Sequence, residues 1–215
     1  MTWVPMEPLT NMQRYWLITG SIAPRPIALV TSCSRDCRCN AAPFSSFTYM
    51  GEEPSLMVIG IDKYGEESHR PGETKDTLTN ITTRREFVVN MVDEAIGERM
   101  VACATDYPAH VSEVEAAGFT LVNSTAIGVP RLAEAPIAWE CKLFKVLEFS
   151  RQRSIVFGEI VGMHFREGLL DEVGPRVRLD QFTPLGRLGG PNYCRSIDRL
   201  RLPVPTYSSV GKPRV

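Results

Sequence analysis

The chain has 215 residues, of which 43% are hydrophobic, so folding can bury roughly 70% of the surface of the unfolded chain around one core. We expect one domain over residues 1–215, with an N-terminal extension over about residues 1–20 and a C-terminal tail over about residues 195–215. The 24 basic and 25 acidic residues give a net charge of -1, which argues against nucleic acid or an anionic membrane and favours a small-molecule partner. The chain has no apolar run of membrane-spanning length, and Glu7 and Pro8 stand where a secretory signal needs an apolar core, so we expect a cytoplasmic protein.

The six cysteines predict neither a disulfide framework nor a metal site. Three of them, Cys33, Cys37 and Cys39, are close together, but a structural zinc site requires CxxC pairs and a fourth ligand, and the first histidine is His69. We therefore expect reduced thiols in a strand and its turn, and no bound metal.

The first half of the chain reads as strand, strand, helix, strand. Uninterrupted apolar runs predict buried strands over Ile27–Thr31, Leu56–Ile61 and Phe87–Val92. A short helix is predicted over Lys75–Arg85, with Thr74 or Asp76 capping its first turn.

The second half predicts two further helices, over Asp93–Ala104 and Val111–Ala117, and two further strands, over Ile137–Leu143 and Ile155–Phe165. Gly118 is the expected C-terminal cap, and Gly158 and Gly162 indicate a bulge or bend in the last strand. Beyond Asp180 the Pro and Gly residues predict a loop and an extended tail. The fold class is mainly β, a β-barrel with peripheral helices.

One candidate ligand-binding segment runs from Asn40 to Phe47. It combines small residues, which let a planar ligand approach the backbone, with Ser45 and Ser46, whose hydroxyls can donate hydrogen bonds. The alternative is that serines after a proline simply form a turn.

A second candidate lies at the start of the predicted helix, where Lys75, Asp76 and Thr77 are followed by Asn80. The first amides of a helix are unpaired and its N-terminal end is partly positive, so phosphate can bind there with help from Lys75 and Thr77. The alternative is that Asp76 only caps the helix and Lys75 is a solvated surface charge.

A third candidate is the Gly-rich segment Gly186–Tyr193, in which Arg187 and Tyr193 can cover a bound substrate. No helix is predicted after it, so it is not a nucleotide-binding fingerprint, and the alternative is an ordinary turn.

Taken together, the segments Pro24–Ser32, Asn40–Phe47, Lys75–Ile81 and Glu86–Asn90 resemble the flavin reductase-like, FMN-binding split-barrel family, which includes flavoredoxin-like proteins. The resemblance implies an FMN-binding split β-barrel and a homodimer with FMN near the subunit interface. Carried over by motif position, the candidate cofactor contacts are Arg25, Thr31, Ser32, Asn40, Ala41, Ala42, Ser45, Ser46, Lys75, Asp76, Thr77 and Asn80. Family members commonly have a glycine in the turn before the asparagine; here we expect Asp36 to take the left-handed position.

The resemblance implies an NADH- or NADPH-dependent oxidoreductase of the flavin reductase type, in which the cofactor performs the chemistry and no side-chain acid, base or nucleophile is required. The alternative is a non-catalytic FMN-binding protein that stores flavin or transfers electrons. A third hypothesis is a structural barrel that binds no ligand. A serine hydrolase is disfavoured because no GxSxG element is present, and His164 is expected to pack in the core.

Overall fold

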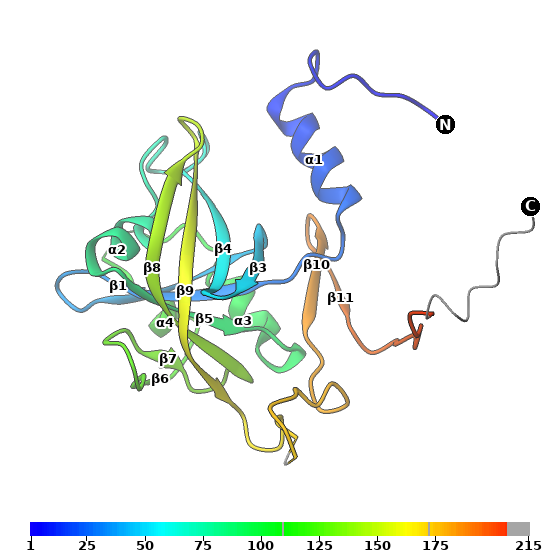
Figure 1. Ribbon diagram of the computed structural model, residues 1–215. Helices are drawn as coiled ribbons and strands as arrows, with labels where there is room; N and C mark the ends of the chain where they lie inside the picture. Colours follow the sequence, from blue (N-terminus) through cyan, green and yellow to red (C-terminus); the bar gives the residue numbers. More distant parts are fainter. Residues whose placement is uncertain (109, 172, 206–215) are drawn as a thin grey trace, which may run out of the picture.

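A computed structural model describes residues 1–108, 110–171 and 173–205. Its main sheet is antiparallel and has seven strands in the order β2-β1-β5-β8-β9-β4-β3 (Figure 1). The strands are β1 (Ala28–Cys33), β2 (Cys39–Phe44), β3 (Phe47–Glu52), β4 (Ser55–Asp62), β5 (Glu86–Met91), β8 (Ile137–Glu148) and β9 (Arg153–Phe165). All five predicted strands are confirmed, while β2 and β3 form from the segment around Asn40–Phe47 and the residues after it.

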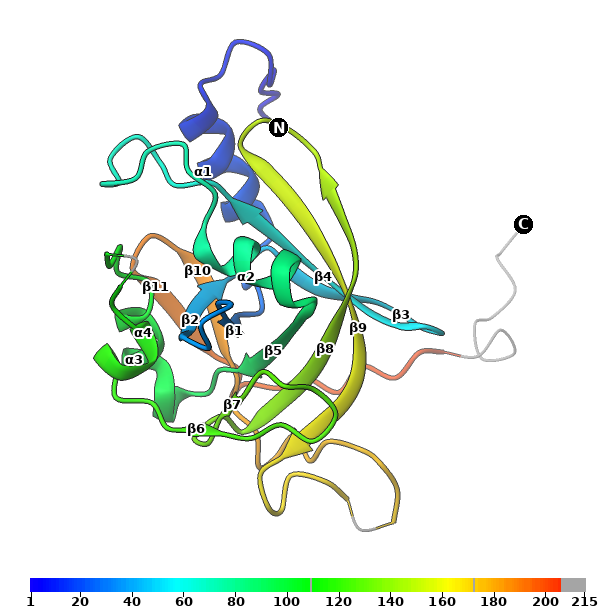
Figure 2. The same ribbon diagram turned by 90° about the vertical axis from the view of Figure 1, so that its left-hand side faces the viewer.

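The sheet curls into a barrel because its two outermost strands are neighbours in the chain. Only Ser45 and Ser46 separate β2 from β3, and the Gly60 amide on β4 donates to the Ser46 carbonyl at 2.8 Å. The long strands β8 and β9 bend sharply, and Figure 2 shows them crossing the molecule from top to bottom. Their register shifts opposite Gly162 and beside Gly158, which confirms the predicted bulges.

Helix α2 (Asp76–Arg84) closes one end of the barrel. Its apolar residues Leu78 and Ile81 pack into the barrel core with Phe87. Lys75 is the N-cap residue and makes no side-chain capping bond, so the prediction that Thr74 or Asp76 caps the helix is wrong. The helix ends where Arg85 takes the left-handed conformation, with φ of 61°.

A second apolar layer covers the outer face of β1 and β2. It contains η1 (Glu94–Ile96), α3 (Gly97–Ala102) and α4 (Glu113–Ala116), within the two predicted helical segments, and Gly118 follows α4 with φ of 68° as expected. Met100 and Val114 pack there against Leu29 and Ala41. The short strands β6 (Leu121–Val122) and β7 (Arg131–Leu132) pair beside this layer.

The region predicted as a loop after Asp180 contains a hairpin instead, formed by β10 (Leu185–Gly189) and β11 (Asn192–Arg195). Gly186 of β10 lies tightly against Pro24 and Cys194. A side chain does not fit at this position, which explains why the strand contains a glycine there. The backbones of Arg25 and Arg187 exchange two hydrogen bonds of 2.9 Å, which hold the hairpin beside the barrel.

The N-terminal extension contains a helix that the sequence analysis did not predict, α1 (Asn11–Ser21), which begins with a capping box between Thr10 and Gln13. None of its residues is buried, and it projects from the body of the molecule next to β10 (Figure 1). The end of the predicted C-terminal tail, residues 206–215, lies outside the described residues. In the part of the chain that the structure describes, no helix is long and apolar enough to cross a membrane.

The cysteine prediction is wrong in one respect: Cys33 and Cys39 form a disulfide. They are directly opposite each other in the β1–β2 pair, so the hairpin register itself brings the two thiols together. Cys37, and not Asp36, takes the left-handed turn position, with φ of 59°. The other four cysteines are free thiols, as expected.

Candidate cofactor site

The candidate site is a cavity between β2 and the start of α2, which we call the main cavity of the site; its volume is about 410 Å³, within the range typical of small-ligand sites. Two cavities of about 140 Å³ adjoin it, one toward the β10–β11 hairpin and one toward the β1–β2 turn. Each shares wall residues with the main cavity, so the three form one groove along β2. The polar side chains of the main cavity are Asn40, Tyr64, Glu67, Ser68, Lys75, Asp76, Thr77, Thr105, Asp106 and Glu113.

The first turn of α2 forms one wall of the main cavity. The amides of Leu78 and Thr79 bond back to the Lys75 carbonyl, whereas those of Asp76 and Thr77 have no earlier helical carbonyl to bond. The side chains of Lys75 and Thr77 lie at the same wall. Unpaired amides, the positive end of a helix dipole, an ammonium group and a hydroxyl together suit a phosphate.

Two residues that the sequence analysis missed, Tyr64 and Arg70, bind Asp76, the acidic residue at this wall. The Arg70 guanidinium donates to both carboxylate oxygens of Asp76, at 2.9 and 2.8 Å, and stacks 4.2 Å from the centre of the Tyr64 ring. The Tyr64 hydroxyl donates to Asp76 at 3.2 Å, and burial together with the Asp76 charge raises the pKa of Tyr64 to about 12. The charge of Asp76 is therefore compensated and does not exclude an anion.

Asn40 is held in position from behind by a buried polar chain. The Asn80 amide donates to the Ser32 hydroxyl at 3.2 Å, and this hydroxyl donates to Oδ1 of Asn40 at 2.8 Å. Ser32 is fully buried and Asn80 nearly so. These two predicted residues support Asn40, which lines the cavity, and Asn80 also lines the smaller cavity toward the β1–β2 turn.

The remaining predicted contacts are divided between the groove and the core. Ala42 lines the main cavity and Ser45 the cavity toward the hairpin. Ala41 is buried in the apolar layer behind β2. Thr31 faces away, because its hydroxyl donates to the Pro130 carbonyl at 2.8 Å and accepts from Asn90 at 3.2 Å. Ser46 is at the turn where the barrel closes.

The cavity toward the hairpin brings Arg187 and Tyr193 together with Tyr15 of α1 and Ser45. The Arg187 guanidinium is 4.6 Å from the centre of the Tyr193 ring and bonds to its hydroxyl. Arg25, which is buried, supports this wall by donating to Ser45 at 3.4 Å and to the backbone of the hairpin. One cation among aromatic rings suits a flat anionic ligand.

Two buried polar atoms beside the main cavity have no hydrogen-bond partner among the described residues: Nε of Arg70 and Oε2 of Glu113. Buried polar groups are rarely left unpaired, so these atoms indicate where a polar ligand completes the site. The donors at this cavity, which are the open amides of α2, the hydroxyl of Thr77 and the ammonium group of Lys75, fit the phosphate of a flavin mononucleotide.

Solved structures share this fold over nearly the whole chain. The 2-nitrobenzoate 2-nitroreductase NbaA of Pseudomonas fluorescens is 61% identical, with a TM-score of 0.87, and the match covers 96% of this chain and 98% of that one. Nitrilotriacetate monooxygenase component B of Bacillus cereus is 32% identical, with a TM-score of 0.86 and coverages of 94% and 98%. A flavin reductase with a split barrel domain from Shewanella frigidimarina, at 21% identity, a TM-score of 0.77 and coverages of 95% and 100%, matches in fold.

These matches define the fold class as the split β-barrel of flavin-binding proteins, as predicted. Residues 20–184 match the family described as flavin reductase like domain. The chain belongs to this family and is a flavoprotein of the flavin reductase type.

Proposed function

We propose that the chain binds FMN in the groove along β2 and works as an oxidoreductase that takes electrons from NADH or NADPH. The observation that carries the proposal is the wall at the start of α2, where open amides, Lys75 and Thr77 meet at one end of a cavity whose side is Asn40–Phe44. When bound, FMN accepts a hydride and passes the electrons to a second substrate. The protein binds and orients the cofactor.

Individual residues have distinct proposed tasks at this site. Lys75, Thr77 and the first amides of α2 hold the phosphate, because these are the groups that converge at the helix start. Asn40 and the backbone near Ala42 lie beside the ring, with Asn40 fixed by Ser32. Arg70 compensates the charge of Asp76, so that this carboxylate does not repel a phosphate held beside Lys75.

The first experiment is an absorbance spectrum of the purified protein, repeated without oxygen after addition of NADH and then NADPH. We expect a flavin spectrum that bleaches with one of the two donors. A flavin spectrum that only dithionite or a partner protein bleaches would favour the electron carrier. A protein that binds no flavin would contradict the proposal.

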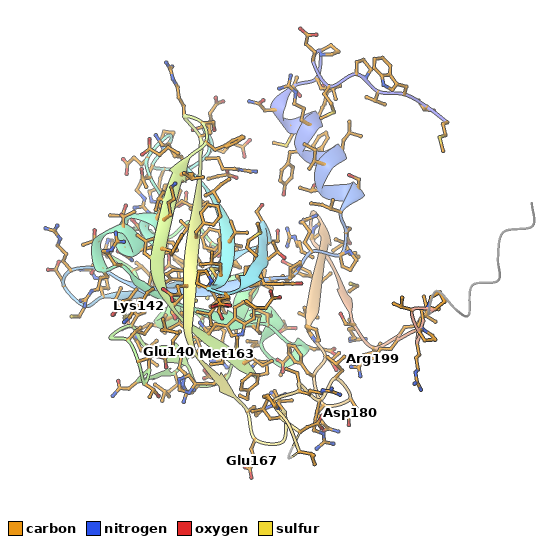
Figure 3. All side chains as sticks on the ribbon, in the orientation of Figure 1. Glu140, Lys142, Met163, Glu167, Asp180 and Arg199 are labelled. Atoms are coloured by element: carbon orange, nitrogen blue, oxygen red, sulfur yellow. A yellow bond between two sulfur atoms is a disulfide. The ribbon has the colours of Figure 1, made fainter. Side chains whose placement is uncertain are left out.

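A double variant tests the assignment of the phosphate site. Lys75→Ala with Thr77→Ala removes the ammonium group and the hydroxyl but leaves the helix amides, so we expect FMN affinity to fall by about a hundredfold, from two charge-assisted bonds of about 1.5 kcal/mol each. Lys142→Ala, an exposed lysine on β8 that is labelled in Figure 3, is the matched charge control. Equal FMN affinity in both variants would overturn the assignment.

A more specific activity is favoured by the 61% identity with a 2-nitrobenzoate nitroreductase. We propose that the electron acceptor is a nitroaromatic carboxylate, held by Arg187 and Tyr193 in the cavity toward the hairpin. Reduction of the nitro group to the hydroxylamine consumes two NAD(P)H and two protons and releases one water. Arg187→Ala should raise the KM for 2-nitrobenzoate about tenfold, with a smaller effect on uncharged nitrobenzene. Arg195→Ala, an exposed arginine on the same hairpin, is the control.

A homodimer is the assembly that the family resemblance implies, and the exposed apolar surface supports it. Trp16 and Ile18 of α1 are 64% and 50% exposed, and Tyr49 and Met50 of β3 are 64% and 57% exposed. An eleven-residue helix with no buried residue is marginally stable in water, so a surface that covers α1 would stabilise it. Light scattering should give twice the mass of the 24.0 kDa chain, and a monomeric mass would contradict the dimer.

The cytoplasmic location stays a prediction.

A further inference from the structure

Glu113 is the first residue of α4 and reaches the groove from the side opposite α2. It lines both the main cavity and the cavity toward the β1–β2 turn, where Asn40 and Asp76 are its polar neighbours in both walls. No motif singles it out, because it is one of two glutamates in a short helical segment, Val111–Ala117.

The two carboxyl oxygens of Glu113 have different surroundings. Asn40 lies beside Glu113 in both cavity walls, and because its Oδ1 already accepts from Ser32, its amide nitrogen is the group that can donate to the carboxyl group. Oε2 is buried and has no partner among the described residues. A buried ionised oxygen without a donor is unfavourable, whereas a protonated one needs only an acceptor in the cavity.

The electrostatic surroundings also favour the protonated form. Burial raises the pKa of Glu113, and the Asp76 charge raises it further; together they outweigh the lowering effects of the residue's own backbone amide, of Asn40 and of Arg70. Arg70 is committed to Asp76 through two hydrogen bonds. The other charged or titratable groups of the two cavity walls are Asp36, Arg38, Tyr64, Glu67, Lys75, Cys103 and Asp106.

We propose that Glu113 holds its proton in the flavin complex and donates it in a hydrogen bond from Oε2 to the bound flavin nucleotide. This inference rests on the proposed function, since it requires FMN in the groove. Glu113 is then a positioning residue that shares its carboxyl group between Asn40 and the cofactor. An ionised Glu113 at the same place repels the electron-rich oxygens of the flavin, so FMN affinity must fall as this group loses its proton.

The test is the dissociation constant of FMN, measured by quenching of flavin fluorescence between about pH 5 and pH 9, the interval in which a raised carboxyl pKa is detected. For the wild type we expect affinity to fall as the pH rises. Glu113→Gln keeps a donor that does not titrate, so its affinity should stay near the low-pH value of the wild type throughout. Glu113→Ala should bind about tenfold more weakly at low pH, the size of one lost hydrogen bond.

Glu115→Gln, an exposed glutamate on the same helix, is the matched control and should follow the wild type. If Glu113→Gln keeps the pH dependence of the wild type, or if Glu113→Ala binds FMN equally well, the proposal is overturned. Riboflavin lacks the phosphate of FMN, so repeating the series with riboflavin shows which part of the ligand Glu113 contacts. If the pH dependence of the affinity is lost, the bond is to the phosphate; if it persists, the bond is to the ring or the ribityl chain. Absence of FMN binding by the wild type would instead contradict the proposed function.

Discussion

The Ser32 hydroxyl, on β1, donates to Oδ1 of Asn40, on β2, over 2.8 Å, and itself accepts from the Asn80 amide of α2. One buried hydroxyl therefore links β1, which lies behind the main cavity, to β2 and α2, which line it. It also fixes the orientation of the Asn40 carboxamide, because Oδ1 is bound to Ser32 and only the amide nitrogen is left to donate to a further group.

Ser32→Ala should weaken both stability and FMN binding. The substitution leaves the Asn80 donor and the Asn40 acceptor without their partner, which costs about 1–3 kcal/mol of unfolding free energy. Because Asn40 is then free to rotate, FMN affinity should fall by about five- to tenfold, the value of one hydrogen bond. Urea unfolding and a fluorescence titration measure the two effects.

Ser55→Ala removes an exposed hydroxyl that bonds only within the β3–β4 turn, at 3.0 Å to the Glu52 carbonyl, and is the control. It should change neither quantity appreciably. Loss of stability without loss of affinity in Ser32→Ala would show that the buried chain does not position Asn40 for the cofactor.

The disulfide between Cys33 and Cys39 predicts a thiol count. The denatured, unreduced protein should show four free thiols, and reduction should raise the count to six with a mass increase of two hydrogens. Cys33→Ser with Cys39→Ser should lower the free energy of unfolding by about 2 kcal/mol, as expected for a loop of this length. Six thiols before reduction would mean that the pair is reduced, as the sequence alone suggested.

Strands β1, β4 and β5 were predictable because each contains an apolar run, and β8 because its apolar residues alternate with Glu140 and Lys142. Ala28–Thr31, Ile59, Ile61 and Phe87–Val89 are buried within the sheet, and burial favours such apolar runs. Helix α1 and the β10–β11 hairpin escaped prediction for the opposite reason. Neither buries a periodic apolar face, and β10 holds its place through backbone bonds to Arg25 and tight packing of Gly186, which composition does not reveal.

The candidate site was predictable only in part. Residues that lie in local sequence motifs were predicted, and residues that come from other parts of the chain were not. Asn40, Lys75 and Thr77 belong to local motifs, and the structure places them at one cavity. Tyr64 and Glu113 come from a loop and a four-residue helix, and only the tertiary fold brings them to this cavity, while Arg70 contacts the site through its ion pair with Asp76. Thr31 and Ser32 belong to one motif, but neighbouring residues on a strand face opposite sides of the sheet. Ser32 therefore bonds to Asn40, whereas Thr31 bonds to Pro130 on the other side.

Gly158 should be the least replaceable glycine of β9. A Cβ at this position would lie 2.4 Å from the Phe87 ring and 2.9 Å from the Met57 sulfur, both fully buried in the core. Gly158→Ala should therefore lower the free energy of unfolding by about 1–3 kcal/mol through overpacking. Gly174→Ala, where a Cβ meets nothing within 4 Å, is the control, and equal stabilities in urea would contradict the packing described.

The last prediction concerns Glu140, a carboxylate that is only 1% exposed on β8 beside β9, the strand that carries Met163 (Figure 3). It accepts from the amides of Thr125 and Ala126, both at 2.6 Å, and bonds to Nε2 of His164, which corrects the expectation that this histidine is only packed in the core. Burial opposes ionisation, but the bonds from Thr125, His164 and Ala126 outweigh it and hold the pKa of Glu140 below its usual range.

A carboxyl pKa that is lower in the folded than in the unfolded protein adds stability above the unfolded pKa, and this contribution is lost as the pH falls through the folded value. Glu140→Gln should therefore lower the free energy of unfolding at pH 7 by about 2–3 kcal/mol, the value of a hydrogen-bonded charge. The difference from the wild type should shrink as the pH falls below about 4.3, the unperturbed pKa of glutamate. Urea unfolding at a series of pH values measures this, with exposed Glu148→Gln on the same strand as the control. A difference that stays constant with pH would mean that Glu140 contributes through packing alone, because only the loss of an ionised acceptor depends on the proton.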